Sequence, residues 1–240
     1  MYFFSSFYFI TAISVVSSIP SLKGTSITTI VKLVNQCDSA IHVGQLGDTI
    51  LNSGNVINIA PGSSKKYRFE GQWSGRFWAR EVCEANVCQI AGAAFPASLA
   101  EFTFRASGDK DYYDISFVDG YNLPIRIDPI QANTTAQKGS ESGKYWCGTP
   151  TCDTVPQCPS ELQVKSADGA YIGCLSACSK FETPEYCCTE ANNTPDTCLI
   201  NDYAASVKKA CPDVYSYAYD DVSSLYECRA SGYTITWCPK

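Results

Sequence analysis

Short runs in which apolar and polar residues alternate recur between residues 25 and 130. Each run is rich in β-branched and aromatic residues, which favour strands, and each is bounded by Gly, Pro, Ser, Asp or Asn. The runs are ITTIVKLVN, NVINIA, KKYRFE, RFWAREV, AEFTFRA and YYDISFV. Strands at this spacing, with turns between them, predict a mainly β protein built on an antiparallel β-sandwich or barrel.

The pattern changes in the second half of the chain. Ten of the 14 cysteines fall between residues 147 and 228, in a stretch of loop-like composition. One helix is predicted there: Asn201 or Asp202 can cap it, and Tyr203, Val207 and Ala210 follow at helical spacing. The chain then returns to a strand, YTITW, near its end. We therefore predict a sandwich core from about 25–130 plus this last strand, and a disulfide-rich region at about 147–228.

The first 18 residues, MYFFSSFYFITAISVVSS, are apolar and end in small residues. This pattern predicts a secretory signal peptide over 1–18, cut near Ser18–Ile19, with the mature domain at 19–240. No Lys or Arg precedes the apolar run, which argues against a signal peptide. The alternative is a membrane anchor, but the run is shorter than the ~20 residues of a spanning helix. We expect a secreted, extracellular protein without a membrane span.

The 14 cysteines admit two interpretations. Zinc binding has some support, because Cys174 and Cys178, and Cys147 and Cys152, have spacings near those of metal ligands. His42 is the one histidine, however, and we expect it on a strand of the sandwich. In a secreted chain seven disulfides are favoured over a metal, although spacing alone leaves on the order of 10⁵ connectivities. We predict no metal and no cofactor.

The net charge of −6 argues against a phosphate-backbone partner and against anionic membrane surfaces. A neutral polysaccharide suits this charge, and we expect a monomer that binds no nucleic acid. Sequons at Asn133 and Asn192 lie in polar, loop-like stretches and are candidate glycosylation sites.

Seven motifs, taken in their order along the chain, resemble the thaumatin-like proteins, which include the plant pathogenesis-related group and osmotin. The resemblance covers nearly the whole mature chain. The motifs are RFWAREVC at 76–83, LAEF at 99–102, YYDISFVDGYNLPI at 112–125, CPSELQV at 158–164, YCCT at 186–189, CPDVYSYAYDD at 211–221 and the closing YTITWCP.

The resemblance implies a complete disulfide pattern. Its pairs are Cys37–Cys238, Cys83–Cys88, Cys147–Cys228, Cys152–Cys211, Cys158–Cys174, Cys178–Cys187 and Cys188–Cys198. Larger members of the family have 16 cysteines, and the missing pair falls after Cys88, in the segment IAGAAFPAS. We expect the same fold without this pair, and the sequence does not predict the shape of this loop.

The resemblance also implies an acidic cleft between the sandwich and the disulfide-rich region. By motif its residues are Arg76, Glu101, Asp114, Asp119 and Asp221. Asp114 lies in a predicted strand and Asp119 precedes a glycine in a predicted turn, so both side chains could reach one groove. Arg76 is a suitable partner for such an acidic cluster.

Two carboxyl groups that flank a sugar bond are what glycoside hydrolysis requires. Crowded like charges raise one pKa and leave another low, which separates an acid from a base. Glu101 is the candidate acid and Asp119 the candidate nucleophile or base, with Asp114 and Asp221 as modulators or sugar ligands. A structural role is the alternative: Asp114 and Asp221 could cap turns or pair with Arg76.

The resemblance implies binding of β-1,3-glucan or a related cell-wall polysaccharide, in defence or cell-wall interaction. The alternatives are a weak endo-β-1,3-glucanase that uses Glu101 and Asp119, and a loop-mediated inhibitor of a foreign hydrolase. A serine or cysteine hydrolase is disfavoured, because His42 is the one histidine and every cysteine has an expected disulfide partner.

Overall fold

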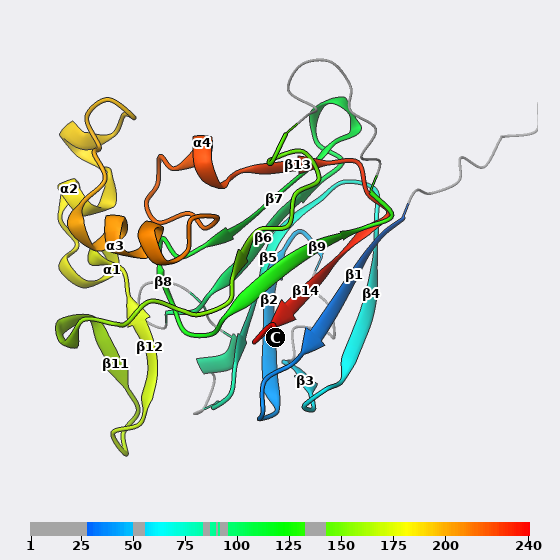
Figure 1. The fold of residues 1–240 in the computed structure, drawn as a ribbon, viewed down its shortest axis with the longest axis horizontal. Coiled ribbons are helices and arrows are strands. Elements are labelled where there is room, and N and C mark those ends of the chain that lie inside the picture. The colour runs from blue at the N-terminus through cyan, green and yellow to red at the C-terminus, as the bar shows by residue number, and fades with distance from the viewer. Residues whose placement is uncertain (1–27, 50–55, 84–86, 90, 92–95, 133–142) are drawn as a thin grey trace, which may run out of the picture.

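A computed structural model describes residues 28–49, 56–83, 87–89, 91, 96–132 and 143–240. The predicted signal peptide and Asn133 lie outside these residues. Figure 1 shows large sheets at one end of the molecule, with β1 and β4 at their outer edge, and short helices with a β-hairpin at the other end.

The first large sheet has five strands in the order β10-β9-β14-β1-β4. Their bounds are β10 Thr151–Cys152, β9 Ile125–Ile130, β14 Gly232–Trp237, β1 Thr28–Asn35 and β4 Ser64–Glu70. The first and last strands of the described residues, β1 and β14, pair in parallel, whereas the other strand pairs of this part of the chain are antiparallel. An antiparallel sandwich was predicted, and this pair differs because almost the whole domain serves as the long crossover that parallel strands need.

The second large sheet has six strands in the order β13-β7-β6-β5-β2-β3. Their bounds are β13 Tyr226–Cys228, β7 Asp111–Ser116, β6 Leu99–Phe104, β5 Trp73–Arg80, β2 Ile41–Gly47 and β3 Ile57–Ile59. The six runs predicted as strands correspond to β1, β3, β4, β5, β6 and β7. His42 lies in β2, on a strand as expected.

Aromatic side chains join the two large sheets. Tyr233 of β14 contacts Phe102 and Phe104 of β6 and Tyr113 of β7, with ring centroids 4.8–5.7 Å apart. All four rings are buried. Each fully buried aromatic side chain removes a large apolar area from water, so this contact between the sheets is a main source of stability.

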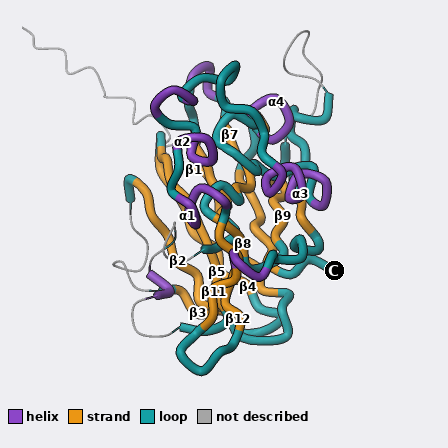
Figure 2. The backbone as a smooth tube through the Cα atoms, turned by 90° about the vertical axis from the view of Figure 1, so that its left-hand side faces the viewer, coloured by secondary structure: helices purple, strands orange, loops and turns teal. Residues whose placement is uncertain are grey.

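The disulfide-rich region contains short helices and a small sheet. The helices are α1 Ala177–Phe181, α2 Pro184–Cys187, α3 Asp202–Ala210 and α4 Asp221–Ser224, with 3-10 turns η4 Ser160–Leu162 and η5 Glu190–Asn192. Two further 3-10 turns, η2 Val87–Gln89 and η3 Ser107–Asp109, lie in the first half of the chain. The helix predicted after residue 201 is α3, and the Asn201 side chain caps it by accepting a hydrogen bond from the backbone N–H of Ala204. Figure 2 shows α1, α2 and α3 together on one side of the molecule.

A three-stranded sheet, in the order β11-β12-β8, connects this region to the sandwich. Its strands are β11 Gln163–Lys165, β12 Tyr171–Leu175 and β8 Gly120–Tyr121. Because β8 follows β7 after a short turn, the turn that carries Asp119 lies where the two regions meet.

All 14 cysteines form disulfides, and none is free. The pairs are Cys37–Cys238, Cys83–Cys88, Cys147–Cys228, Cys152–Cys211, Cys158–Cys174, Cys178–Cys187 and Cys188–Cys198. They are the same pairs that the family resemblance implies. Among the described residues, no helix is long and apolar enough to cross a membrane.

Gly120 fixes the turn after β7. Its φ is +123°, and a Cβ atom at this position would lie 2.2 Å from the carbonyl oxygen of Cys174 in β12. Glycine alone adopts such backbone without strain, and it also allows β8 to approach β12 closely. Gly120 therefore holds the preceding residue, Asp119, in place.

We expect Gly120→Ala to lower the free energy of unfolding by about 3 kcal/mol or more, because backbone strain and steric overlap add. Gly169→Ala is the matched control: its φ is +87°, but no heavy atom lies within 4 Å of the added Cβ. Its expected cost is about 1–2 kcal/mol, from the backbone alone. Urea unfolding of both variants measures the difference, and equal losses would contradict the role of the close approach.

Candidate functional site

Three of the five predicted site residues form a row across the six-stranded sheet. Arg76 of β5 is the register partner of Glu101 of β6, which is the register partner of Asp114 of β7. Side chains at directly opposed positions point to the same face of a sheet. The next residue on each strand, Phe77, Phe102 or Ile115, is buried in the core, so the charged row points away from the core.

This row lies in an open groove of about 390 Å³. The polar lining residues include Arg76, Glu101, Asp114, Ser74 and Thr103, and an aromatic ring is supplied by Tyr112. Leu46, whose exposed fraction is 52%, and Leu225 also line the groove. A shallow groove with charged, hydroxyl and aromatic side chains is suited to a polar ligand rather than to an apolar one.

Arg76 lies between two carboxylates. Its Nη1 is 3.8 Å from Oε1 of Glu101 and 3.7 Å from Oδ2 of Asp119. These distances exceed those of charge-assisted hydrogen bonds, so both carboxylates keep acceptor positions for another partner. The structure thus brings Asp119, from the turn before β8, to the row on β5 and β6.

Burial governs the protonation of Glu101. Desolvation raises the pKa of its carboxyl group above the usual range, and the charge of Asp119 raises it further. The charge of Arg76 and a hydrogen bond from Ser116 oppose this shift and lower the pKa. The net direction is upward, although 35% of the side chain is exposed to solvent.

Asp114 is the second acid of the row, and its side chain is half-buried. Its Oδ1 atom is buried and makes no hydrogen bond within the described part of the chain. Desolvation raises the pKa of this carboxyl well above its usual value, and the charges of Glu101 and Asp221 add to the increase. Asp114 therefore favours the protonated state more strongly than an exposed aspartate does.

Asp221 begins α4, and its charge acts on Asp114. Its Oδ1 accepts a hydrogen bond of 2.7 Å from the hydroxyl of Tyr215, and this bond orients the carboxylate. Sequence reasoning did not identify Tyr215, Ser116 or Leu46. Tyr215 lies in the motif CPDVYSYAYDD, six residues before Asp221, but no spacing rule pairs a tyrosine with an acid at that distance.

Tyrosines near the site in sequence have different positions in space. Tyr112 lines the groove, whereas Tyr113 and Tyr121 are buried in the core. Tyr219 donates its hydroxyl proton to the carbonyl oxygen of Asn193. Alternation along β7 explains why only one residue of the pair Tyr112–Tyr113 reaches the groove.

An apolar pocket lies between α3, β8 and α1, with a volume of about 70 Å³. Phe117, Tyr121, Leu162, Tyr203 and Val207 contribute to its lining, and it contains none of the five predicted site residues. It is much smaller than the groove. Across the described residues, no group of three or more His, Cys, Asp and Glu side chains could hold a metal ion.

The model of the Thaumatin family matches residues 35–239. The chain belongs to the thaumatin family. It is 41% identical over 232 residues to pathogenesis-related thaumatin-like protein 3.5 of Cryptomeria japonica, covering 88% of this chain and 90% of the relative. It is 43% identical over 187 residues to a glucan endo-1,3-beta-glucosidase of Prunus avium, covering 70% and 72%. The family resemblance inferred from the motifs is thereby confirmed.

One solved structure resembles this member of the thaumatin family over most of its length. It is a laminaripentaose-producing beta-1,3-glucanase in complex with laminaritetraose, with a TM-score of 0.60, and the alignment covers 88% of this chain and 98% of that chain. At 11% sequence identity the similarity concerns the fold alone. It supports the predicted mainly β fold class.

The buried acid gives a prediction about pH. Asp114 has a higher pKa folded than unfolded, so it binds a proton more tightly in the folded state. Stability then falls as pH rises from the unfolded value, about 4, through the folded value. Asp114→Asn removes this loss, and we expect the variant to be more stable than wild type at pH 7 by about 1 kcal/mol or more, with the difference vanishing near pH 3.

Urea unfolding of wild type and Asp114→Asn between these pH values measures the effect. Asp196→Asn is the control, because Asp196 is exposed and loses the same charge. The free energy of unfolding of wild type is compared with that of Asp114→Asn at each pH. A difference that rises in favour of wild type from pH 4 to pH 7 would contradict a raised pKa of Asp114 in the folded state.

Proposed function

We propose that the protein is a secreted protein that binds β-1,3-glucan, or a related cell-wall polysaccharide, in the groove over β5, β6 and β7. The observation that carries this proposal is the row of Arg76, Glu101 and Asp114, whose register places charged groups side by side in an open groove. The name of the Prunus avium relative, a glucan endo-1,3-beta-glucosidase, supports a glucan as the ligand. A role in defence or cell-wall interaction would follow from this binding.

The chemistry of the groove suits a sugar chain. Carboxylates accept hydrogen bonds from sugar hydroxyls, and the guanidinium of Arg76 donates to sugar oxygens. The ring of Tyr112 offers an apolar face beside them. A neutral ligand also avoids the repulsion that a protein of net charge −6 would exert on an anion at an acidic groove.

Secretion is supported by the seven disulfides, because such bonds persist in oxidising compartments. The sequon residue Asn192 lies in η5 and is half-buried. Glycosylation at this position remains part of the proposal.

Co-sedimentation with insoluble β-1,3-glucan tests the proposed binding. We expect Tyr112→Ala to weaken retention about tenfold, because truncating a tyrosine that contacts the ligand commonly costs more than about 1 kcal/mol. Tyr171→Ala is the matched control, since Tyr171 is 46% exposed and lies in β12, outside the groove. Cellulose serves as a second ligand with a different linkage. Failure of wild type to sediment with the β-1,3-glucan, or equal retention of both variants, would refute binding in the groove.

Hydrolysis is a second candidate, and the raised pKa of Glu101 favours it. Glu101 would act as the general acid and Asp119 as nucleophile or base, as the two carboxyls of a glycosidase do. Both contact the same Nη1 of Arg76, so their oxygens are no further apart than the sum of 3.8 and 3.7 Å. This upper limit allows the separation of about 5–5.5 Å found in retaining enzymes. It also allows the lower end of the range of about 6.5–9.5 Å found in inverting enzymes.

A further inference from the structure

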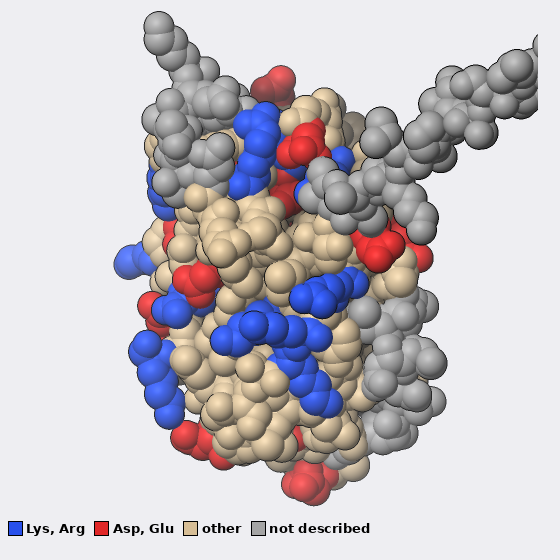
Figure 3. All heavy atoms as spheres, turned by 90° about the vertical axis from the view of Figure 1, so that its right-hand side faces the viewer, with Lys and Arg blue, Asp and Glu red and all other residues tan. Residues whose placement is uncertain are grey.

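The outward face of the five-stranded sheet carries basic side chains that the groove does not use. Alternation places Lys32 of β1 and Lys66 and Arg68 of β4 on this face, and Lys65 lies beside them on the edge strand. Lys65, Lys66 and Arg68 are exposed and Lys32 is half-buried. We call these four residues the basic cluster. Figure 3, which views the side where β1 and β4 lie, shows Lys and Arg side chains over the middle of the face and acidic ones around its rim.

The basic cluster concentrates positive side chains on this face of the sheet. Lys32 and Lys66 are direct register partners, and like charges at opposed positions destabilise a sheet. Within the described part of the chain none of the four forms an ion pair. The outward-facing acids of this sheet are Glu70, at the end of β4, and Asp128, which pairs with Arg126 at 3.0 Å. A protein of net charge −6 thus presents a positive surface away from its groove.

Protection of the sheet edge explains only part of this arrangement. The strand β4 is at the edge of the sheet, and lysines on edge strands prevent pairing with another chain. That role accounts for Lys65, Lys66 and Arg68. It does not account for Lys32, which lies on the inner strand β1 between β14 and β4.

We propose that the basic cluster binds a linear anionic polysaccharide with a carboxylate on successive sugars, a polyuronate. Neighbouring strands lie about 4.8 Å apart and alternate residues about 7 Å apart, so the charges form a flat array of closely spaced cations. Ammonium and guanidinium groups donate charge-assisted hydrogen bonds to carboxylates. The half-buried Thr234, the register partner of Lys32 on β14, adds a hydroxyl for the sugar.

Two other anionic partners fit the face less well. A membrane surface is normally held by apolar side chains as well as charge, but the exposed large apolar residues of the described chain all lie outside β1, β4, β9 and β14. A nucleic acid fits less well because four cations are fewer than the six to ten phosphate contacts of typical binders. The proposal is independent of glucan binding, because the basic cluster and the groove lie on different sheets.

The test is binding to immobilised, de-esterified polygalacturonate at ~0.01 M and ~0.15 M salt, where the Debye length is about 30 and 8 Å. Wild type is expected to bind at the lower salt concentration and to weaken at the higher. The triple variant Lys32→Gln, Lys66→Gln, Arg68→Gln is expected to bind about tenfold more weakly, from three exposed ionic contacts of modest strength. Fully methyl-esterified polymer, which lacks the carboxylates, should not bind.

A second triple variant is the matched control. Lys165→Gln, Lys180→Gln and Lys209→Gln remove the same charge from exposed positions in the disulfide-rich region. We expect it to bind polygalacturonate as wild type does, and both triple variants to keep wild-type retention on insoluble β-1,3-glucan. If wild type binds polygalacturonate but is not retained on insoluble β-1,3-glucan, glucan binding in the groove is refuted and the present proposal stands.

Four results would overturn the proposal. The first is no binding of wild type to polygalacturonate at low salt, including the case in which it binds only anionic phospholipid vesicles. The second is equal weakening by both triple variants, which indicates net charge alone. The third is equal binding of the methyl-esterified polymer. The last is self-association of the first triple variant in size-exclusion chromatography with unchanged polymer binding, which indicates edge protection only.

Discussion

Replacing Cys37 and Cys238 by alanine is expected to lower the free energy of unfolding by about 2–5 kcal/mol. The disulfide joins residues separated by 201 positions, so it restricts the unfolded chain more than any shorter loop would. It also joins the region after β1 to the end of β14, the two strands that pair in parallel. Their pairing brings the first and last strands of the described chain together, and the disulfide secures it.

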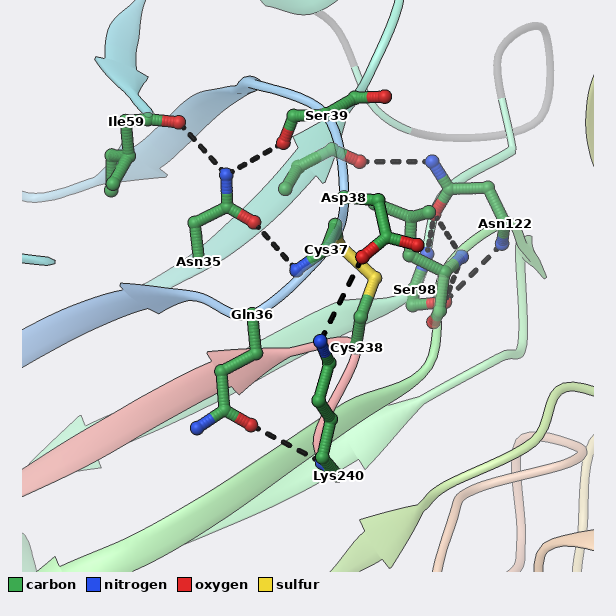
Figure 4. The surroundings of a disulfide bond; sticks show 12 residues. Asn35, Gln36, Cys37, Asp38, Ser39, Ile59, Ser98, Asn122, Cys238 and Lys240 are labelled. Carbon is green, nitrogen blue, oxygen red and sulfur yellow. Dashed lines mark hydrogen bonds and ion pairs between the residues drawn. A yellow bond between two sulfur atoms is a disulfide. The ribbon is translucent and has the colours of Figure 1, made fainter. Parts of the chain in front are cut away.

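Figure 4 shows the hydrogen bonds that surround this disulfide. The Asn35 side chain is buried, accepts a hydrogen bond from the backbone N–H of Cys37 and donates to the carbonyl oxygens of Ser39 and Ile59. The backbone N–H of Lys240 donates to the side chain of Gln36. These bonds hold the turn in place without the disulfide, so the double variant should fold with reduced stability rather than fail to fold.

The control is removal of the Cys83–Cys88 disulfide, which spans a separation of 5. The chain-entropy relation gives a loss for this short loop that is about 3 kcal/mol smaller. Urea unfolding of wild type and both double variants measures the difference, and thiol titration of denatured wild type should detect no free thiol. Equal losses from the two variants would show that the length of the closed loop does not set the stabilisation.

Local pattern predicted the strands whose sequences alternate. In β1, for example, buried Val31 and Leu33 alternate with half-buried neighbours, and the period of two is plain in the sequence. The strand β2 was less visible, because Gly44 and Gly47 interrupt the alternation. A Cβ at either glycine would meet the ring of Trp78 or Trp73 within 2.5 Å, so packing between strands explains these glycines and not local propensity.

The partners of each strand were beyond local pattern. Nothing in YTITW indicates that it pairs in parallel with a strand about 200 residues earlier, because any alternating run can pair with any other. The same limit applies to the site. Motifs identified Arg76, Glu101 and Asp114, but only the register of β5, β6 and β7 shows that these three form one row. Tyr215 was missed because its contact with Asp221 depends on the path of a loop.

Burial has the largest influence on the pKa values of the two acids in the row. Crowded carboxyls were expected to raise one pKa and leave another low, whereas the pKa values of Glu101 and Asp114 are both raised. The first cause differs from the expectation, however, since burial contributes more than the neighbouring charges do. Burial of a side chain on the outer face of a sheet depends on the loops that cover it, which no strand pattern specifies.

Glu101→Gln is expected to reduce release of reducing ends from soluble β-1,3-glucan by about 10²-fold or more, the usual contribution of a general acid. Glutamine keeps the size and the hydrogen-bonding reach of the side chain but has no acidic proton to transfer to the leaving oxygen. Retention on insoluble glucan should change far less, because ground-state contacts are preserved. Asp119→Asn is expected to suppress hydrolysis as well, since an amide is neither an effective nucleophile nor a base.

Arg76→Ala removes the neighbouring positive charge and keeps both candidate catalytic carboxyls, so it tests the electrostatic effect alone. It removes the cation that lowers the pKa of Glu101, so that pKa rises and the pH optimum of hydrolysis should shift upward. Affinity and product release are therefore measured together for wild type and the three variants. Weaker retention of Glu101→Gln and Asp119→Asn, with no product released even by wild type, would exclude hydrolysis and leave binding alone. If neither quantity responds to any of the three changes, the groove is not the working surface, and the exposed loops become the place to look for a bound hydrolase.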